Sequence, residues 1–171
     1  MAAIRAAQLG MKVACIEKSR TLGGTCLNVG CIPSKAMLDS SELFHLAKQR
    51  FGKHGIKFDG ISLDLAAMLA RKAEVVKGLT DGVRFLFRKN KIETVFGTAR
   101  VTSPTSVQVA LNEGGSVDLQ TAHILLATGS EPVQLPFLPY NGRTVVDSTG
   151  ALEFDKVPDH LVVVEIGRAH V

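Results

Sequence analysis

Two cysteines lie close together in a glycine-bearing segment near the amino terminus of this 171-residue chain. Gly30 stands between Cys26 and Cys31 and can form a tight turn at no steric cost. Such a turn can bring the two Cα atoms within disulfide range. Cys31 also precedes Pro33, where a helix is expected to begin, and a helix N-terminus favours a reactive thiol. The pair could therefore carry reversible thiol–disulfide exchange.

The spacing alone leaves other interpretations of these cysteines open. A structural disulfide or two unpaired core cysteines would have the same spacing. A zinc site is less favoured, because no second pair of Cys or His lies at ligand spacing. The third cysteine, Cys15, falls in an apolar stretch and is expected to be a buried, inert thiol. No histidine is spaced as a metal ligand or general base, so no metal site is expected.

The composition excludes several classes of protein. Hydrophobic residues make up 46% and charged residues 21% of the chain, which is typical of a folded domain and not of a disordered one. No apolar run approaches the roughly 18 residues of a membrane helix. Aromatic residues reach only 5% and the 20 Lys and Arg are scattered, so nucleic-acid binding is not expected.

The elements that position the cysteines alternate between strand and helix patterns. Residues 1–10 predict a helix closed by Gly10, and residues 11–17 predict a buried parallel strand. Residues 20–35 are expected to form a glycine-bearing loop. Two longer helices are then expected over residues 32–50 and 62–90, the second of them capped by Ser62.

Strand patterns dominate the second half of the chain. Short strands are expected over residues 92–96, 99–101, 106–111 and 116–119. A hairpin turn is expected at residues 112–115, where Asn and Glu precede two glycines. Further apolar strands are expected over residues 123–127 and 161–164, separated by a proline-bearing linker. The alternation predicts an α/β fold with an antiparallel insertion.

The residues from Gly23 to Lys35 resemble the redox-active disulfide motif of the pyridine nucleotide–disulfide oxidoreductases. The form CLNVGCIPSK, at residues 26–35, is most similar to the dihydrolipoamide dehydrogenase branch of that family. Glu17, the tripeptide at residues 97–99 and the tetrapeptide at residues 127–130 follow in the family's order. The resemblance covers about residues 1–164.

The resemblance implies FAD as the electron carrier and NAD as the second cofactor. Cys26 would attack the substrate disulfide, and Cys31 would face the flavin and form the charge-transfer thiolate. Glu17 would hydrogen-bond the adenosine ribose, a role that its place at a strand end also supports, and Lys35 would lie near the flavin ring. The other residues expected along the cofactor are Gly23, Gly24, Thr25, Cys26, Gly97, Ala99, Thr128, Gly129 and Ser130.

The resemblance also implies how the chain is organised. Residues 1–143 are expected to form an incomplete FAD-binding Rossmann-like domain that contains the redox helix and the β insertion. The family's first glycine loop, G-x-G-x-x-G, is not found in the chain. Residues 144–164 would be a linker and the first strand of an NAD-binding domain, and residues 165–171 a non-native tail.

The function that the resemblance implies is oxidation of dihydrolipoamide with NAD⁺. The expected partners are a lipoamide-bearing acyltransferase of a 2-oxo acid dehydrogenase complex and, in the whole protein, a second copy that forms a homodimer. The expected location is the cytoplasm. The alternatives are a mercuric reductase, another disulfide reductase of the family, or an inert FAD-domain fragment. Because the glycine loop is not in the sequence, we expect the 171-residue polypeptide to bind FAD weakly and to lack NAD⁺-dependent turnover.

Overall fold

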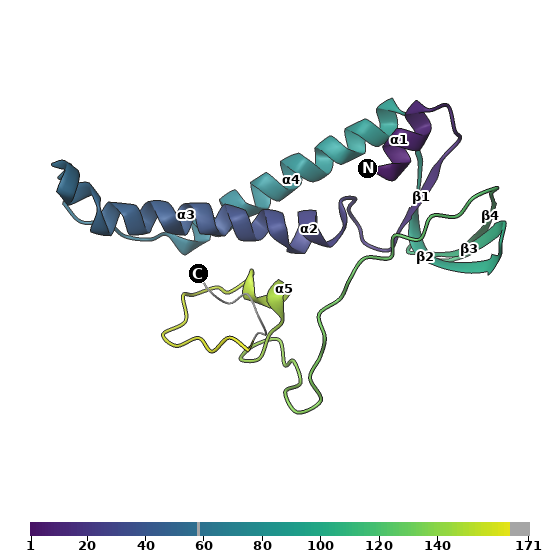
Figure 1. Cartoon of the computed structure of the whole chain (residues 1–171). Helices are drawn as coiled ribbons and strands as arrows, with labels where there is room; N and C mark the ends of the chain where they lie inside the picture. The colour runs from purple at the N-terminus through teal and green to yellow at the C-terminus, as the bar shows by residue number, and fades with distance from the viewer. Residues whose placement is uncertain (58, 165–171) are drawn as a thin grey trace.

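A computed structural model describes residues 1–57 and 59–164 of the chain, so the tail expected at residues 165–171 lies outside the described residues. Figure 1 shows the order of the elements along the chain. The helices are α1 (Ala2–Gln8), α2 (Gly24–Val29), α3 (Cys31–Gln49), α4 (Leu65–Lys89) and α5 (Ser148–Ala151), with a 3-10 turn, η1, at Phe51–His54. The strands are β1 (Ala14–Glu17), β2 (Glu93–Ser103), β3 (Ser106–Leu111) and β4 (Ser116–Gln120).

The four strands form one sheet in the order β1-β2-β3-β4. The first part of β2 runs parallel to β1, and its second part runs antiparallel to β3. The two short strands expected over residues 92–101 are therefore one strand of 11 residues. Gly97 lies where β2 changes partner, and a Cβ there would come 2.3 Å from the carbonyl oxygen of Ala110. The expected hairpin turn between β3 and β4 is confirmed by the hydrogen bond from Leu111 N to Gly115 O, 3.0 Å.

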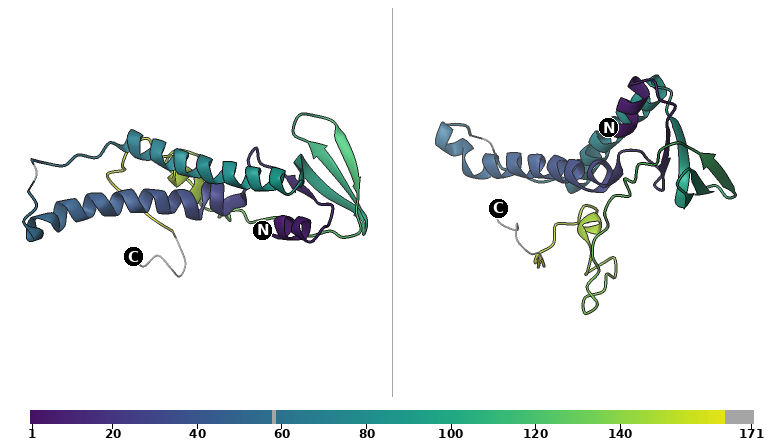
Figure 2. Two further views of the ribbon diagram at one scale, coloured as in Figure 1. Left: turned by 90° about the horizontal axis from the view of Figure 1, so that it is seen from above. Right: turned by 45° about the vertical axis from the view of Figure 1, so that its right-hand side comes forward.

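Helices α3 and α4 form a long pair that projects away from the sheet (Figures 1 and 2). Arg71 on α4 joins them: its guanidinium donates to the Asp39 carboxylate at 2.7 Å and to the Ala36 carbonyl at 3.0 Å. The helix expected over residues 62–90 begins later than expected. Asp64 caps it by accepting a hydrogen bond from Ala67 N at 2.9 Å, so the expectation of a cap at Ser62 is wrong. Asp64 acts as the N-cap because its carboxylate reaches the free N–H groups of the first turn.

A small core lies where α1, β1 and the end of α4 meet. Its buried members are Leu22, Phe87 and Ile92. Gly10 has φ +87° and closes α1 as expected. Its N–H donates to the Ala7 carbonyl at 3.0 Å, which satisfies one of the carbonyls left free at the helix end.

Two expectations about β1 are corrected. The strand is parallel, as expected, but it is an edge of the described sheet and only half-buried. Cys15 on this strand is likewise half-buried, since one side of β1 has no neighbouring strand among residues 1–57 and 59–164. Burial is still sufficient to raise the pKa of the Cys15 thiol, with the charge of Glu17 acting in the same direction.

The apolar runs at residues 123–127 and 161–164 are not strands. Leu125, Leu126 and Val162 each expose more than two-thirds of their surface. A strand requires a neighbour for its backbone hydrogen bonds, and within the described residues no strand pairs with either run. The chain after β4 instead extends away from the sheet toward α5 (Figure 1). No helix in the described part of the chain is long and apolar enough to span a membrane.

Candidate active site

The two cysteines of the motif lie at a junction between two helices. Residues 24–29, expected to be part of a loop, form helix α2, which carries Cys26. Gly30 separates α2 from α3, and Cys31 is the first residue of α3. A Cβ on Gly30 would come 2.9 Å from the Thr25 carbonyl oxygen, so glycine is required for the two helices to approach this closely.

The junction brings the two thiols into contact. Both Cys26 and Cys31 are exposed free thiols. A side-chain hydrogen bond with Cys31 raises the pKa of the Cys26 thiol, and partial desolvation adds to this, while the charge of Lys35 acts in the opposite direction. The structure therefore brings together the two residues expected to exchange disulfides, and it leaves Cys26 open to a substrate.

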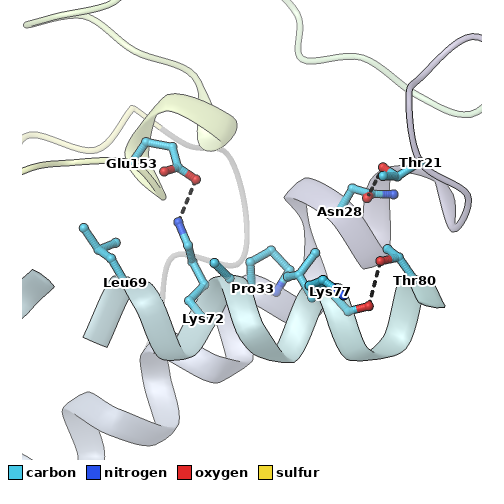
Figure 3. A pocket seen from close by; sticks show the side chains of 10 residues that line it. Thr21, Asn28, Pro33, Leu69, Lys72, Lys77, Thr80 and Glu153 are labelled. Atoms are coloured by element: carbon cyan, nitrogen blue, oxygen red, sulfur yellow. Dashed lines mark hydrogen bonds and ion pairs between the residues drawn. The ribbon is translucent and has the colours of Figure 1, made fainter. Parts of the chain in front are cut away.

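Asn28 holds the segment before Cys26 in place (Figure 3). Its amide oxygen accepts a hydrogen bond from Thr21 Oγ1 at 2.7 Å. Its amide nitrogen donates to the carbonyl oxygens of Gly24 at 2.9 Å and Leu22 at 3.3 Å. Sequence reasoning assigned Asn28 no role. Its low propensity for a helix interior, inside a short glycine-flanked segment, is the signal that could have found it.

The glycines at the start of α2 have different surroundings. Gly23 has φ +118°, and a Cβ on it would come 2.3 Å from Leu27 Cδ2, so packing alone requires a glycine there. Gly24 has φ +66°, and a Cβ on it would meet no atom within 4 Å. Its bare backbone therefore faces open space, where a ligand can approach closely.

A second group of expected cofactor residues meets α2 from the far end of the sequence. Thr25 Oγ1 donates to the Ser130 carbonyl oxygen at 3.5 Å. A Cβ on Gly129 would come 3.9 Å from the same hydroxyl, an ordinary contact distance. Thr128 belongs to the same exposed loop. An ion pair between Lys18 and Glu131 links this loop to the end of β1.

The remaining expected cofactor residues lie along β1, β2 and α3. Glu17 ends β1, and its carboxylate accepts a hydrogen bond from Ser19 N at 2.9 Å. In the register of the sheet, Glu17 lies opposite Phe96, the residue just before Gly97. Ala99 instead lies opposite Val109, in the hairpin part of the sheet. Lys35 lies apart from these residues, in the second turn of α3.

A hollow of about 640 Å³ lies beside these strands. It is lined by Arg20, by residues 94–96 of β2 and by residues 111–113 of the hairpin. Ligands of parallel α/β sheets bind outside the carboxyl ends of the strands. Glu17 lies at such an end, but neither Glu17 nor Gly24 is among the residues that line this hollow. Arg20 was not singled out from the sequence, where it is one of many scattered basic residues.

The described residues were also compared with the ligand sets that metal ions require. Among residues 1–57 and 59–164, no three His, Cys, Asp or Glu side chains gather where they could hold an ion.

Comparison with known proteins identifies a matching family and several proteins of similar sequence. The pyridine nucleotide-disulphide oxidoreductase family matches residues 1–164. The chain is 53% identical over 167 residues to dihydrolipoyl dehydrogenase 3 of Pseudomonas aeruginosa, covering 97% of this chain and 36% of that protein. It is 49% identical to the mitochondrial dihydrolipoyl dehydrogenase 1 of Arabidopsis thaliana, covering 98% of this chain and 33% of that protein. The chain thus spans about a third of the length of these curated relatives.

A solved structure resembles the fold. The HOCl-induced flavoprotein disulfide reductase of Escherichia coli superposes with a TM-score of 0.69 at 28% identity, covering 91% of this chain and 32% of that protein. The mixed α/β architecture expected from the sequence is confirmed, and this structural neighbour is a flavoprotein.

Proposed function

The chain belongs to the pyridine nucleotide-disulphide oxidoreductase family, and from that premise we propose that Cys26 and Cys31 form the redox-active pair of a dihydrolipoamide dehydrogenase. The observation that carries the proposal is the contact between the two thiols at the α2–α3 junction. The identity of about half of all residues to dihydrolipoyl dehydrogenases supports dihydrolipoamide as the substrate.

The proposed reaction begins with the pair in its disulfide form. A thiolate of dihydrolipoamide attacks Cys26 Sγ, the Cys26–Cys31 bond breaks, and Cys31 leaves as a thiolate. The second substrate thiolate then attacks the substrate sulfur of this mixed disulfide. Cys26 leaves as a thiolate, the lipoamide ring closes, and two electrons have passed from the substrate to the cysteine pair. Cys26 is suited to the first attack because it is exposed on α2.

FAD, when bound, supplies the acceptor that returns the pair to its disulfide form, with NAD⁺ as the final acceptor. Glu17 would hold the ribose, and the loop residues Thr128, Gly129 and Ser130 would close against Thr25. Gly23, Gly24, Lys35, Gly97 and Ala99 complete the proposed set. Because the chain spans about a third of its relatives' length, the part of the reaction proposed for the chain itself is thiol–disulfide exchange.

We further propose the cellular location and the partners of this activity. A disulfide in a cytosolic protein is usually transient and catalytic, so a redox-cycling pair is compatible with the cytoplasmic location that we propose. The names of the relatives support a 2-oxo acid dehydrogenase complex as the context, with a lipoamide-bearing acyltransferase as partner and a homodimeric whole protein.

Trapping the mixed disulfide tests the proposal. The Cys31→Ser chain, treated with lipoamide and quenched with N-ethylmaleimide to cap the freed lipoyl thiol before the ring closes again, should acquire one lipoyl adduct on Cys26, detected by peptide mass spectrometry. The matched Cys26→Ser chain should acquire adduct on Cys31 much more slowly. Equal rates in the two variants would contradict the assigned roles.

A second measurement tests the substrate. One equivalent of dihydrolipoamide should reduce the oxidised pair faster than glutathione, because closure of the lipoamide ring is intramolecular. The similarity to a flavoprotein disulfide reductase keeps a different disulfide substrate as the alternative. Faster exchange with glutathione than with dihydrolipoamide would favour that alternative.

A further inference from the structure

Asn141 and Gly142 lie in an exposed turn of the chain that leads to α5. The turn precedes Asp147, the N-cap residue of that helix. It is closed by the N–H group of Asn141, which donates to the Val145 carbonyl at 2.9 Å. Gly142 has φ +71°, and a Cβ on it would meet no atom within 4 Å. Because no side chain covers the backbone nitrogen of Gly142, this nitrogen is open to the side chain that precedes it.

The other asparagines of the chain have different neighbours. Residues that carry side chains follow Asn28, Asn90 and Asn112. The amide nitrogens of Asn90 and Asn112 donate to backbone carbonyl oxygens, at 2.8 and 3.0 Å. Within the described ranges, no donor reaches the amide oxygen of either residue. Asn141 thus differs from them both in the residue that follows it and in the contacts of its amide oxygen.

Three consecutive backbone N–H groups hold the amide oxygen of Asn141. Those of Arg143, Thr144 and Val145 donate to its Oδ1 at 3.0, 2.9 and 2.9 Å. Its Nδ2 donates to Thr144 Oγ1 at 2.8 Å. When a nucleophile attacks Cγ of an amide, negative charge develops on the oxygen, and donors already aimed at that atom stabilise the charge. The turn therefore activates the side chain of Asn141 toward attack.

We infer that Asn141 is a site of spontaneous deamidation and that the turn around it promotes the reaction. The backbone nitrogen of Gly142 attacks Asn141 Cγ, and the Cγ–Nδ2 bond breaks. The proton of the attacking nitrogen passes through water to the leaving nitrogen, which departs as ammonia. Water then opens the cyclic imide at one of its two carbonyls, which gives aspartate or isoaspartate. The N–H of Gly142 donates to the Val145 carbonyl at 3.2 Å, a long bond whose opening frees the nitrogen.

Incubation of the purified chain at mildly alkaline pH, followed by peptide mass spectrometry, tests the site. The peptide that contains Asn141 should gain the mass that separates a carboxylate from an amide, with release of an equal amount of ammonia. The peptides that contain Asn28, Asn90 and Asn112 should keep their mass over the same period. Conversion of any of these before Asn141, or an Asn141 peptide of unchanged mass, would overturn the inference.

The matched control is Lys91→Gly, which places a glycine after Asn90. Asn90 then has the same following residue as Asn141 but lacks donors to its amide oxygen among the described residues. It should convert about tenfold or more slowly than Asn141, since removal of one such donor slows enzymes by about 10²-fold or more. In urea, which unfolds both sites, the two rates should approach each other. Equal rates in the folded chain, or a difference that persists in urea, would contradict the role of the turn.

Amide hydrogen exchange tests the contacts of Asn141 independently of the reaction. Asn141→Ala removes the acceptor of the three N–H groups, so exchange at residues 143–145 should become faster by about fivefold or more. Asn141→Asp, which has the side chain of one product, keeps an acceptor and adds a charge to it. It should exchange no faster than the parent chain. Faster exchange in both variants, or in neither, would contradict the hydrogen bonding on which the inference depends.

Discussion

Asn28 holds the loop before Cys26 against helix α2, which carries this cysteine. Its three hydrogen bonds reach Thr21, Leu22 and Gly24, so one side chain organises both ends of the turn into α2. The thiol pair, in contrast, is formed by residues whose types and spacing could be recognised from the sequence. A supporting amide could not be recognised in this way, because its partners are mostly backbone carbonyls, which any residue provides.

Asn28→Ala should lower the free energy of unfolding by about 1–3 kcal/mol, because half-buried polar groups lose their partners. Urea denaturation of the reduced chain measures this change. Ser41→Ala is the control: Ser41 makes one local hydrogen bond on the exposed face of α3, and its loss should change stability by less than about 0.5 kcal/mol. Equal effects of the two substitutions would show that Asn28 does not hold the loop.

Helix α2 shows how far sequence patterns can predict individual elements. The three glycines around residues 23–30 favoured a loop, yet the residues between them form a helix that packs against α3. The long helices and the hairpin could be predicted, because their periodicity and turn residues are local signals. The continuous strand β2 could not be predicted, since it exists through two different partner strands.

Gly30→Ala should weaken the disulfide between Cys26 and Cys31. The added methyl group would lie 2.9 Å from the Thr25 carbonyl oxygen and would force α2 away from α3. Relieving such a contact costs about 1–3 kcal/mol, so the equilibrium constant for disulfide formation against glutathione should fall by about 5- to 150-fold. Gly78→Ala, in open space on α4, should leave this constant unchanged. A Gly30→Ala chain with the parental constant would refute the role of the junction.

Lys91→Gly should stabilise the end of α4. Lys91 has φ +54°, in the left-handed region that favours glycine, and it follows the C-cap Asn90. Relief of this strain should raise the free energy of unfolding by about 0.5–1 kcal/mol. Glu74→Gly, in the exposed middle of the same helix, should instead lower it by a similar amount. Destabilisation by both substitutions would contradict the assigned backbone conformation.

At the scale of the whole molecule, one lysine connects the helix pair to the distant carboxyl-terminal segment. The side chain of Lys72 is almost fully buried on α4; it donates to the Leu152 carbonyl at 2.6 Å and pairs with Glu153 at 2.6 Å (Figure 3). The apolar runs at residues 123–127 and 161–164 resembled strands in sequence. A local pattern does not show whether a neighbouring strand is present to pair with them. The position of the carboxyl-terminal segment depends instead on long-range contacts, such as those of Lys72 with Leu152 and Glu153.

Lys72→Met should loosen helix α5, because the buried ammonium group is lost and the Leu152 carbonyl is left without this donor. Amide hydrogen exchange of a peptide covering residues 147–153 should become faster by about fivefold or more, as expected for the loss of a hydrogen bond to a charged group. Lys77→Met removes an exposed ion pair with Asp81 on the same helix and should leave that exchange unchanged. Equal exchange in the two variants would mean that Lys72 does not hold α5.

The central claim is that Cys26 and Cys31 are a reversible redox pair and that Cys15 is not part of it. The most direct test is a redox titration of the chain in mixtures of reduced and oxidised dithiothreitol, followed by alkylation and peptide mapping. We expect one two-electron transition, with a disulfide joining Cys26 to Cys31 and Cys15 free throughout. A dominant disulfide that includes Cys15, or the lack of any disulfide within the chain at oxidising potentials, would contradict the account.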